Sequence, residues 1–131
     1  MASERLLVIH DYEGIRSWLV DLLSASGYRS RGVANLAAAC LAYQSQRPDL
    51  LILVNTGNEA ATLQLLHDLH HTPETCQSRC LVLVEGPVSQ RLAHQAQGTD
   101  TLLRVDLSSA QIHQVVQVGV ERSLGHRTLS R

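Results

Sequence analysis

The chain has 131 residues, carries eleven basic and twelve acidic side chains for a formal net charge of -1, and is 44% hydrophobic. This length suits one domain, and the scattered charges exclude a basic face for nucleic acid or a polybasic patch for a membrane. No apolar run approaches the ~18–20 residues that cross a bilayer, and the opening residues lack the pattern of a signal peptide. Three cysteines without an export signal predict a reduced, cytoplasmic protein.

Strands and helices are predicted to alternate from the start of the chain. Residues 6–9 form the first buried strand. A helix begins at Asp11 and ends at Ser26-Gly27, where Gly27 suits the position that follows a helix C-terminus. Residues 28–33 alternate between polar and apolar side chains, which indicates a strand near the edge of a sheet. Asn35 is expected to cap a second helix.

The unbroken apolar run of residues 50–54 is predicted to be the central strand. It is apolar on both faces and too short for a helix, which is typical of a parallel sheet covered by helices on each side. Asn58 is expected to cap a helix over residues 60–71, and residues 80–84 form a fourth apolar strand. A rather polar helix over residues 88–97 follows.

The last unit begins with a turn at residues 98–100 and a strand over residues 101–105. Ser108 and Gln111 have the spacing of a capping box, and an apolar stripe that starts at Ile112 predicts the last helix.

Residues 1–125 are expected to form one domain, and the polar residues 126–131 a C-terminal tail or the start of a linker. Five strand–helix units predict an α/β, flavodoxin-like doubly wound sheet of five parallel strands with five helices, (βα)5. Folds of this kind bind ligands at the carboxyl ends of their strands, here around residues 54–57.

Four segments resemble the receiver domain of bacterial two-component response regulators, over nearly the whole chain and in the family's order. They are LLVIHDYEGIR at residues 6–16, RPDLLIL at residues 47–53, LLHDLH through PET at residues 65–75, and DTLLR at residues 100–104. The resemblance implies a module that takes a phosphoryl group onto an aspartate, with Mg²⁺ held by that aspartate and by an acidic pair after the first strand. The metal neutralises the repulsion between the attacking carboxylate and the phosphoryl group.

Most reactive groups of that family are replaced at the corresponding positions of this chain. The phosphoacceptor position falls on Val54, or on Asn55 with a one-residue slip, and neither side chain forms an acyl phosphate. The acidic pair falls on His10 and Asp11, so one carboxylate is retained. Because Mg²⁺ prefers oxygen ligands, Asp11 is only a weak residual candidate for a metal ligand, and no metal or cofactor is predicted. Asp11 otherwise suits a helix N-terminus, where acidic side chains are favoured.

The remaining positions of the family site fall on the fourth and fifth strands. The hydroxyl position falls on Val84 or Glu85, and the aromatic position falls on Thr101. The lysine position falls on Arg104, which is either an anion-binding remnant or an ion-pair partner of Asp11 or Glu85.

Two of these losses do not depend on the alignment. All eleven basic residues are arginines, so the family's lysine is missing. No acidic residue lies between Asp49 and Glu59, so the phosphoacceptor is missing as well. The sequence therefore predicts a degenerate receiver, or pseudo-receiver.

Histidine and cysteine side chains give weaker signals. His10 is interpreted as a polar residue at a strand exit, with a pH-sensing or ligand-binding role as the alternative. A solvated helix end is favoured over a zinc site for a second group, because its spacing is weak evidence for a metal. That group is His67, His70, His71, Cys76 and Cys80.

The favoured function is a phosphorylation-independent signalling module that acts by protein contact or dimerisation, as the N-terminal regulatory domain of a larger bacterial regulator. Contact is expected through the last helix and its neighbours, with an outer face of His113, Gln114, Gln117 and Glu121. The alternative is a small-ligand or nucleotide sensor that uses the crevice at the strand ends, although no glycine-rich phosphate loop is present. An enzyme is disfavoured, because no nucleophile–base pair falls at the strand ends.

Overall fold

The computed structural model describes residues 4–96 and 100–125. The strands are β1 (Arg5–Ile9), β2 (Arg29–Val33), β3 (Leu50–Asn55), β4 (Cys80–Glu85) and β5 (Asp100–Val105). The helices are α1 (Glu13–Ala25), α2 (Leu36–Ser45), α3 (Glu59–His71), α4 (Gln90–Gln95) and α5 (Ile112–Ser123). The predicted tail at residues 126–131 and part of the predicted turn at residues 98–100 lie outside the described residues.

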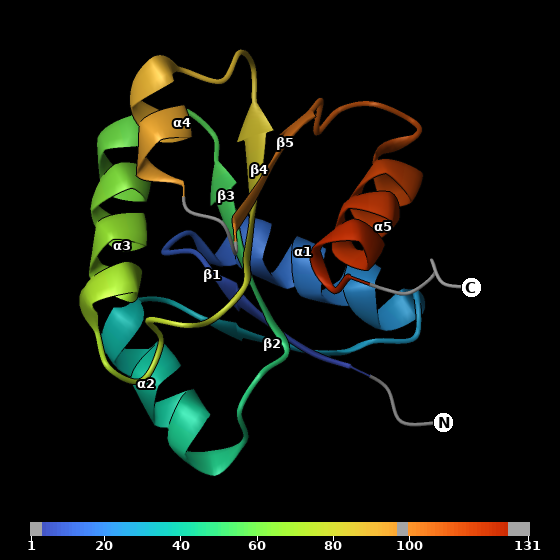
Figure 1. The fold of residues 1–131 in the computed structure, drawn as a ribbon. Helices are drawn as coiled ribbons and strands as arrows, with labels where there is room; N and C mark the ends of the chain where they lie inside the picture. The colour runs from blue at the N-terminus through green and yellow to red at the C-terminus, as the bar shows by residue number, and fades with distance from the viewer. Residues whose placement is uncertain (1–3, 97–99, 126–131) are drawn as a thin grey trace.

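All five strands belong to one parallel sheet with the order β2-β1-β3-β4-β5 (Figure 1). β3 is the central strand and each of its residues is buried, which confirms the prediction for residues 50–54. β2 lies at one edge, as its alternating pattern predicted. The α/β, flavodoxin-like (βα)5 fold is therefore confirmed.

Side chains of the strands alternate between two apolar cores, one on each face of the sheet. From β1, Leu6 and Val8 pack with α1 and α5, whereas Leu7 and Ile9 pack with α2, α3 and α4. Figure 1 shows α1 and α5 on one side of the sheet and the other three helices on the opposite side. Burial on both faces explains why the inner strands are continuous apolar runs.

The predicted helix ends at two asparagines and one glycine are confirmed. Asn35 Oδ1 accepts a hydrogen bond from the Ala38 N–H at 2.9 Å, and Asn58 Oδ1 accepts one from the Ala61 N–H at 3.2 Å. Gly27 follows α1 with φ of 98°, a conformation that glycine adopts without a steric penalty.

The predicted capping box before the last helix is wrong. Asp106 Oδ1 accepts hydrogen bonds from the Ser108 hydroxyl at 2.7 Å and from the Ser108 N–H at 3.0 Å. These bonds hold the pKa of the Asp106 carboxyl below its usual range. Because this local turn engages the hydroxyl, α5 begins only at Ile112, and its N-cap residue Gln111 makes no side-chain capping bond.

Two helices begin later than predicted. Ser89 Oγ accepts a hydrogen bond from the Leu92 N–H at 3.0 Å, so α4 begins after Ser89 and is shorter than the predicted helix over residues 88–97. α1 begins at Glu13 rather than at Asp11. Within residues 4–96 and 100–125, no helix is long and apolar enough to cross a membrane.

Candidate functional site

The carboxyl ends of β1 and β3 open into a pocket of 590 Å³ that extends to α2 and α3. Its lining includes His10, Asp11 and Val54 from the strand ends and Thr62 from α3. Asp11 and Asp68 are the acidic residues of the lining, and none of the lining residues is an arginine. This distribution of charge disfavours phosphate and nucleotide anions at this edge of the sheet.

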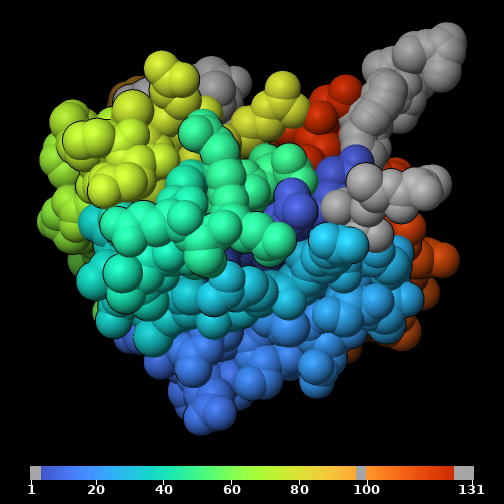
Figure 2. Space-filling view, turned by 90° about the horizontal axis from the view of Figure 1, so that it is seen from below, coloured from blue at the N-terminus to red at the C-terminus, as the bar shows by residue number. Residues whose placement is uncertain are grey.

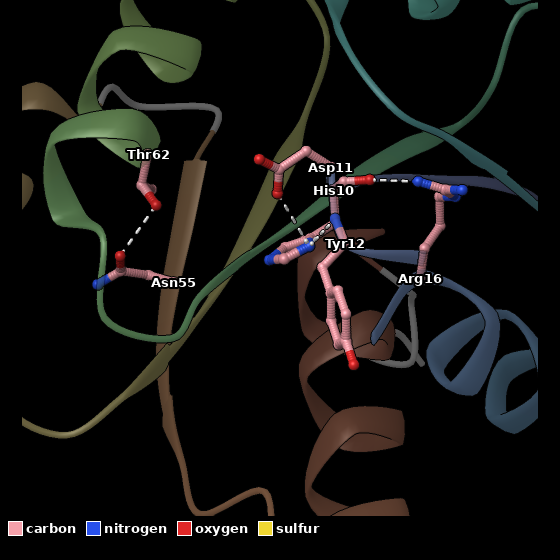
Figure 3. Close-up of polar contacts among 6 residues, drawn as sticks. All are labelled: His10, Asp11, Tyr12, Arg16, Asn55 and Thr62. Carbon is pink, nitrogen blue, oxygen red and sulfur yellow. Dashed lines mark hydrogen bonds and ion pairs between the residues drawn. The ribbon is translucent and has the colours of Figure 1, made fainter. Parts of the chain in front are cut away.

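His10 is held at the exit of β1 by local hydrogen bonds (Figure 3). Its Nδ1 atom accepts a hydrogen bond from the Tyr12 N–H at 3.0 Å and lies 3.6 Å from Asp11 Oδ1. Arg16 Nη1 donates a hydrogen bond to the His10 carbonyl oxygen at 2.7 Å, which ties the exit loop to α1. The Asp11 side chain is 91% exposed. Since α1 begins at Glu13, Glu13 rather than Asp11 is the acid in the first turn of the helix.

The two candidate phosphoacceptor positions at the end of β3 have different surroundings. Val54 is 5% exposed and lines the pocket beside His10 and Asp11. Asn55 is 7% exposed, and its Oδ1 atom accepts a hydrogen bond from Thr62 Oγ1 at 2.9 Å. Figure 3 shows the Asn55 carboxamide turned toward Thr62 and away from His10. Of the two candidate positions, Val54 is therefore the one that lines the pocket.

Thr62 was not among the residues singled out in the sequence. It is 7% exposed and lies one turn into α3, so it is a polar side chain on the buried face of that helix. A buried hydroxyl needs a partner, and this requirement is the one signal in the sequence that could have pointed to the bond with Asn55.

The remaining family positions do not gather around the pocket. Val84 is buried at the end of β4, Glu85 is exposed and Thr101 is half-buried. Arg104 is exposed and lines a separate cavity of 340 Å³ together with Asp106. The ion pairs of the described residues do not include Arg104, so neither Asp11 nor Glu85 is found as its partner.

The predicted histidine and cysteine group divides into surface and interior residues. Within the described ranges, no three histidine, cysteine or acidic side chains are arranged to hold a metal ion. His67 and His71 are exposed and stack with ring centroids 4.1 Å apart. His70 is buried instead, with Nε2 2.8 Å from Asp100 Oδ2. Burial, reinforced by Asp100, raises the pKa of the Cys80 thiol, so this thiol stays neutral and unreactive in the fold.

Known protein structures share this arrangement of strands and helices. No protein-family model and no curated protein matches the chain. The solved structure of the chemotaxis protein CheY4 of Vibrio cholerae is 16% identical, over 93% of this chain and 99% of that chain, with a TM-score of 0.72. A signal receiver domain of a histidine kinase from Syntrophus aciditrophicus is 20% identical, over 98% and 94% of the two chains, with a TM-score of 0.70.

A third similar structure is the N-terminal domain of a response regulator receiver protein from Methanoculleus marisnigri. It is 21% identical over 96% of this chain and 100% of that chain, with a TM-score of 0.63. At these identities the likeness concerns the fold. The chain has the fold of response regulator receiver domains.

Proposed function

We propose that this domain is a pseudo-receiver, a module of two-component signalling that acts by protein contact without accepting a phosphoryl group. The observation that carries the proposal is the end of β3, where buried Val54 lies beside His10 and Asp11 in the pocket. An aliphatic side chain has no atom able to attack phosphorus.

The surrounding residues support the same conclusion. Phosphoryl transfer to a carboxylate needs a nucleophile, a metal site and cations that neutralise the developing charge. The Asn55 carboxamide oxygen is engaged by Thr62, and Asp11 is an exposed carboxylate at the strand ends beside the His10 ring. The arginine at the lysine position, Arg104, lines another cavity. None of these three requirements is met around the pocket.

Incubation with acetyl phosphate and Mg²⁺ is expected to leave the intact mass of the protein unchanged. Beryllofluoride with Mg²⁺, which mimics a bound phosphoryl group, is expected to leave the melting temperature unchanged as well. A receiver domain that retains its phosphoacceptor aspartate is treated in the same way and serves as the positive control. Gain of one phosphoryl mass on any residue of this chain would overturn the proposal, and peptide mapping would locate that residue.

We also infer that the contact surface is the outer face of α5 and that a second copy of this chain binds there. Val118 is 50% exposed in the middle of this helix and is one of its few large apolar side chains in solvent. Glu121 is exposed on the same helix, whereas His113 Nε2 is 2.8 Å from Ser26 Oγ and so connects α5 with the end of α1. An apolar centre with polar surroundings is typical of a contact surface.

Val118→Arg is expected to lower the weight-average molar mass measured by light scattering across a concentration series, because it buries a charge in the contact. Leu41→Arg is the matched control, since Leu41 is 66% exposed on α2. Acetyl phosphate is expected to leave the molar mass of the wild type and of both variants unchanged. A wild-type chain that stays monomeric throughout, or equal effects of both substitutions, would contradict α5 as the surface.

A further inference from the structure

A second pocket lies at the opposite ends of the strands, where β1 and β2 begin. It has a volume of 320 Å³ and is enclosed by the ends of α1 and α2 as well as by the two strands. Figure 2, which views the molecule from below Figure 1, shows the start of β1 emerging between the segment that ends α2 and the segment that leads into β2. The polar residues of the lining are Arg5, Arg29, Arg31, Ser24, Ser30, Tyr28 and Gln46.

Three arginines give this pocket a concentrated positive charge, and we call it the arginine pocket. Arg5 pairs with Arg29 in the register of β1 and β2, and Arg31 lies two residues further along the same face of β2. No acidic residue is among the lining residues, and the ion pairs of the described residues include none of the three arginines. Like charges on neighbouring strands repel one another, so an anion between them would stabilise the fold.

One polar atom beside the three arginines, Arg5 Nε, is hidden from water without a hydrogen-bond partner. Ser30 Oγ is also hidden, but Ser30 pairs with Leu6 in the strand register and so faces the opposite side of the sheet from the arginines. Buried polar groups are nearly always paired, because an unpaired donor loses its water without any compensation. An acceptor oxygen bound between the arginines would satisfy the Arg5 donor.

Protection of the sheet edge against pairing with another chain is a simpler explanation for two of the three arginines. Charged side chains on an edge strand discourage pairing with another chain, and Arg29 and Arg31 are exposed on β2. That explanation does not extend to Arg5, which lies on the inner strand β1 with its Nε atom buried.

The rest of the lining indicates what kind of anion fits. Guanidinium groups match phosphate oxygens with paired hydrogen bonds. Apolar surface from Ala42 and Pro48 and the ring of Tyr28 line the same pocket. Its volume is at the lower end of the range for small-molecule sites. We propose that the arginine pocket binds a small organic phosphate, a phosphate monoester that carries a compact apolar or aromatic group.

Titration calorimetry of the full chain with phenyl phosphate and with inorganic phosphate tests this site directly. Phenyl phosphate is expected to bind more tightly, because it fills the apolar part of the pocket, and to raise the melting temperature. Arg29→Gln and Arg31→Gln are each expected to weaken phenyl phosphate binding about tenfold, the loss of one charge-assisted pair of bonds. Both side chains are exposed, so these substitutions leave the two cores intact.

Arg91→Gln provides the matched control, because it removes the same charge from an exposed position on α4. Its affinity for phenyl phosphate is expected to equal that of the wild type. Absence of binding, or equal weakening by all three substitutions, would overturn the proposal. Equal affinity for inorganic and phenyl phosphate would overturn the assignment to an organic ester.

Discussion

Replacement of His70 by leucine is expected to lower the free energy of unfolding by about 3–5 kcal/mol. The side chains of His70 and Asp100 are 4% and 0% exposed, and His70 Nε2 lies 2.8 Å from Asp100 Oδ2. The pair joins the end of α3 to the start of β5. Leucine would remove the imidazole partner of the Asp100 carboxylate, whose side chain is 0% exposed, and breaking one side of a buried charged pair is costly. Urea unfolding followed by circular dichroism measures the loss.

Two further variants separate this electrostatic cause from packing. The double variant His70→Leu with Asp100→Leu is expected to recover most of the lost stability, because apolar pairs often replace buried ion pairs without a net cost. His71→Leu changes an exposed residue next in sequence and is expected to change stability by less than about 0.5 kcal/mol. If the double variant is no more stable than the single one, the pair is not the source of the effect.

Local patterns in the sequence predicted the fold because their causes are local. The all-apolar run in β3 and the asparagine caps at Asn35 and Asn58 depend on residues within a few positions of each other. The His70–Asp100 pair joins residues 30 positions apart, so helical spacing alone could not distinguish buried His70 from a solvated helix end. The capping-box prediction at Ser108 failed because a competing acceptor, Asp106, lies just before it.

The sequence alone shows which reactive groups the candidate site lacks, but it does not show the geometry of the site. The absence of lysine and of an acid near Val54 can be established from composition and order alone. The extension of the pocket to α2 and α3, and the place of Arg104 in another cavity, depend on how the helices pack. The arginine pocket could not be predicted from the sequence either, because Arg5 and Arg29 become neighbours only through strand register.

Val54→Asp places a carboxylate at the one of the two candidate phosphoacceptor positions that lines the pocket, and it is expected to remain unlabelled by acetyl phosphate. A carboxylate alone supplies the nucleophile, but the cation and the metal ligands are still lacking around it. Arg104 lines a separate cavity, and Asp11 is the remaining carboxylate of the family's acidic pair. Intact-mass spectrometry with acetyl phosphate and Mg²⁺ measures the outcome. Asn55→Asp, treated in parallel, covers the alternative position at the end of β3.

The same substitution has a pH-dependent effect on stability. Val54 is 5% exposed, so burial would raise the folded pKa of the introduced carboxyl above its unfolded value of about 3.9. The neutral form is then favoured in the fold, and the penalty is absent below about pH 4 and grows as the pH rises through the folded pKa. A rise of about 2 pKa units corresponds to about 2.7 kcal/mol at pH 7.

Val54→Asn is the matched control for this pH effect, because asparagine has nearly the same shape as aspartate and cannot ionise. The two variants are expected to unfold at the same urea concentration near pH 4, and Val54→Asp at a lower concentration near pH 7. Equal stability at both pH values would mean that the introduced carboxylate reaches water or a cation. Phosphorylation of Val54→Asp would show that the other parts of a receiver site are still functional in this fold, and the loss of function would then reside in Val54 alone.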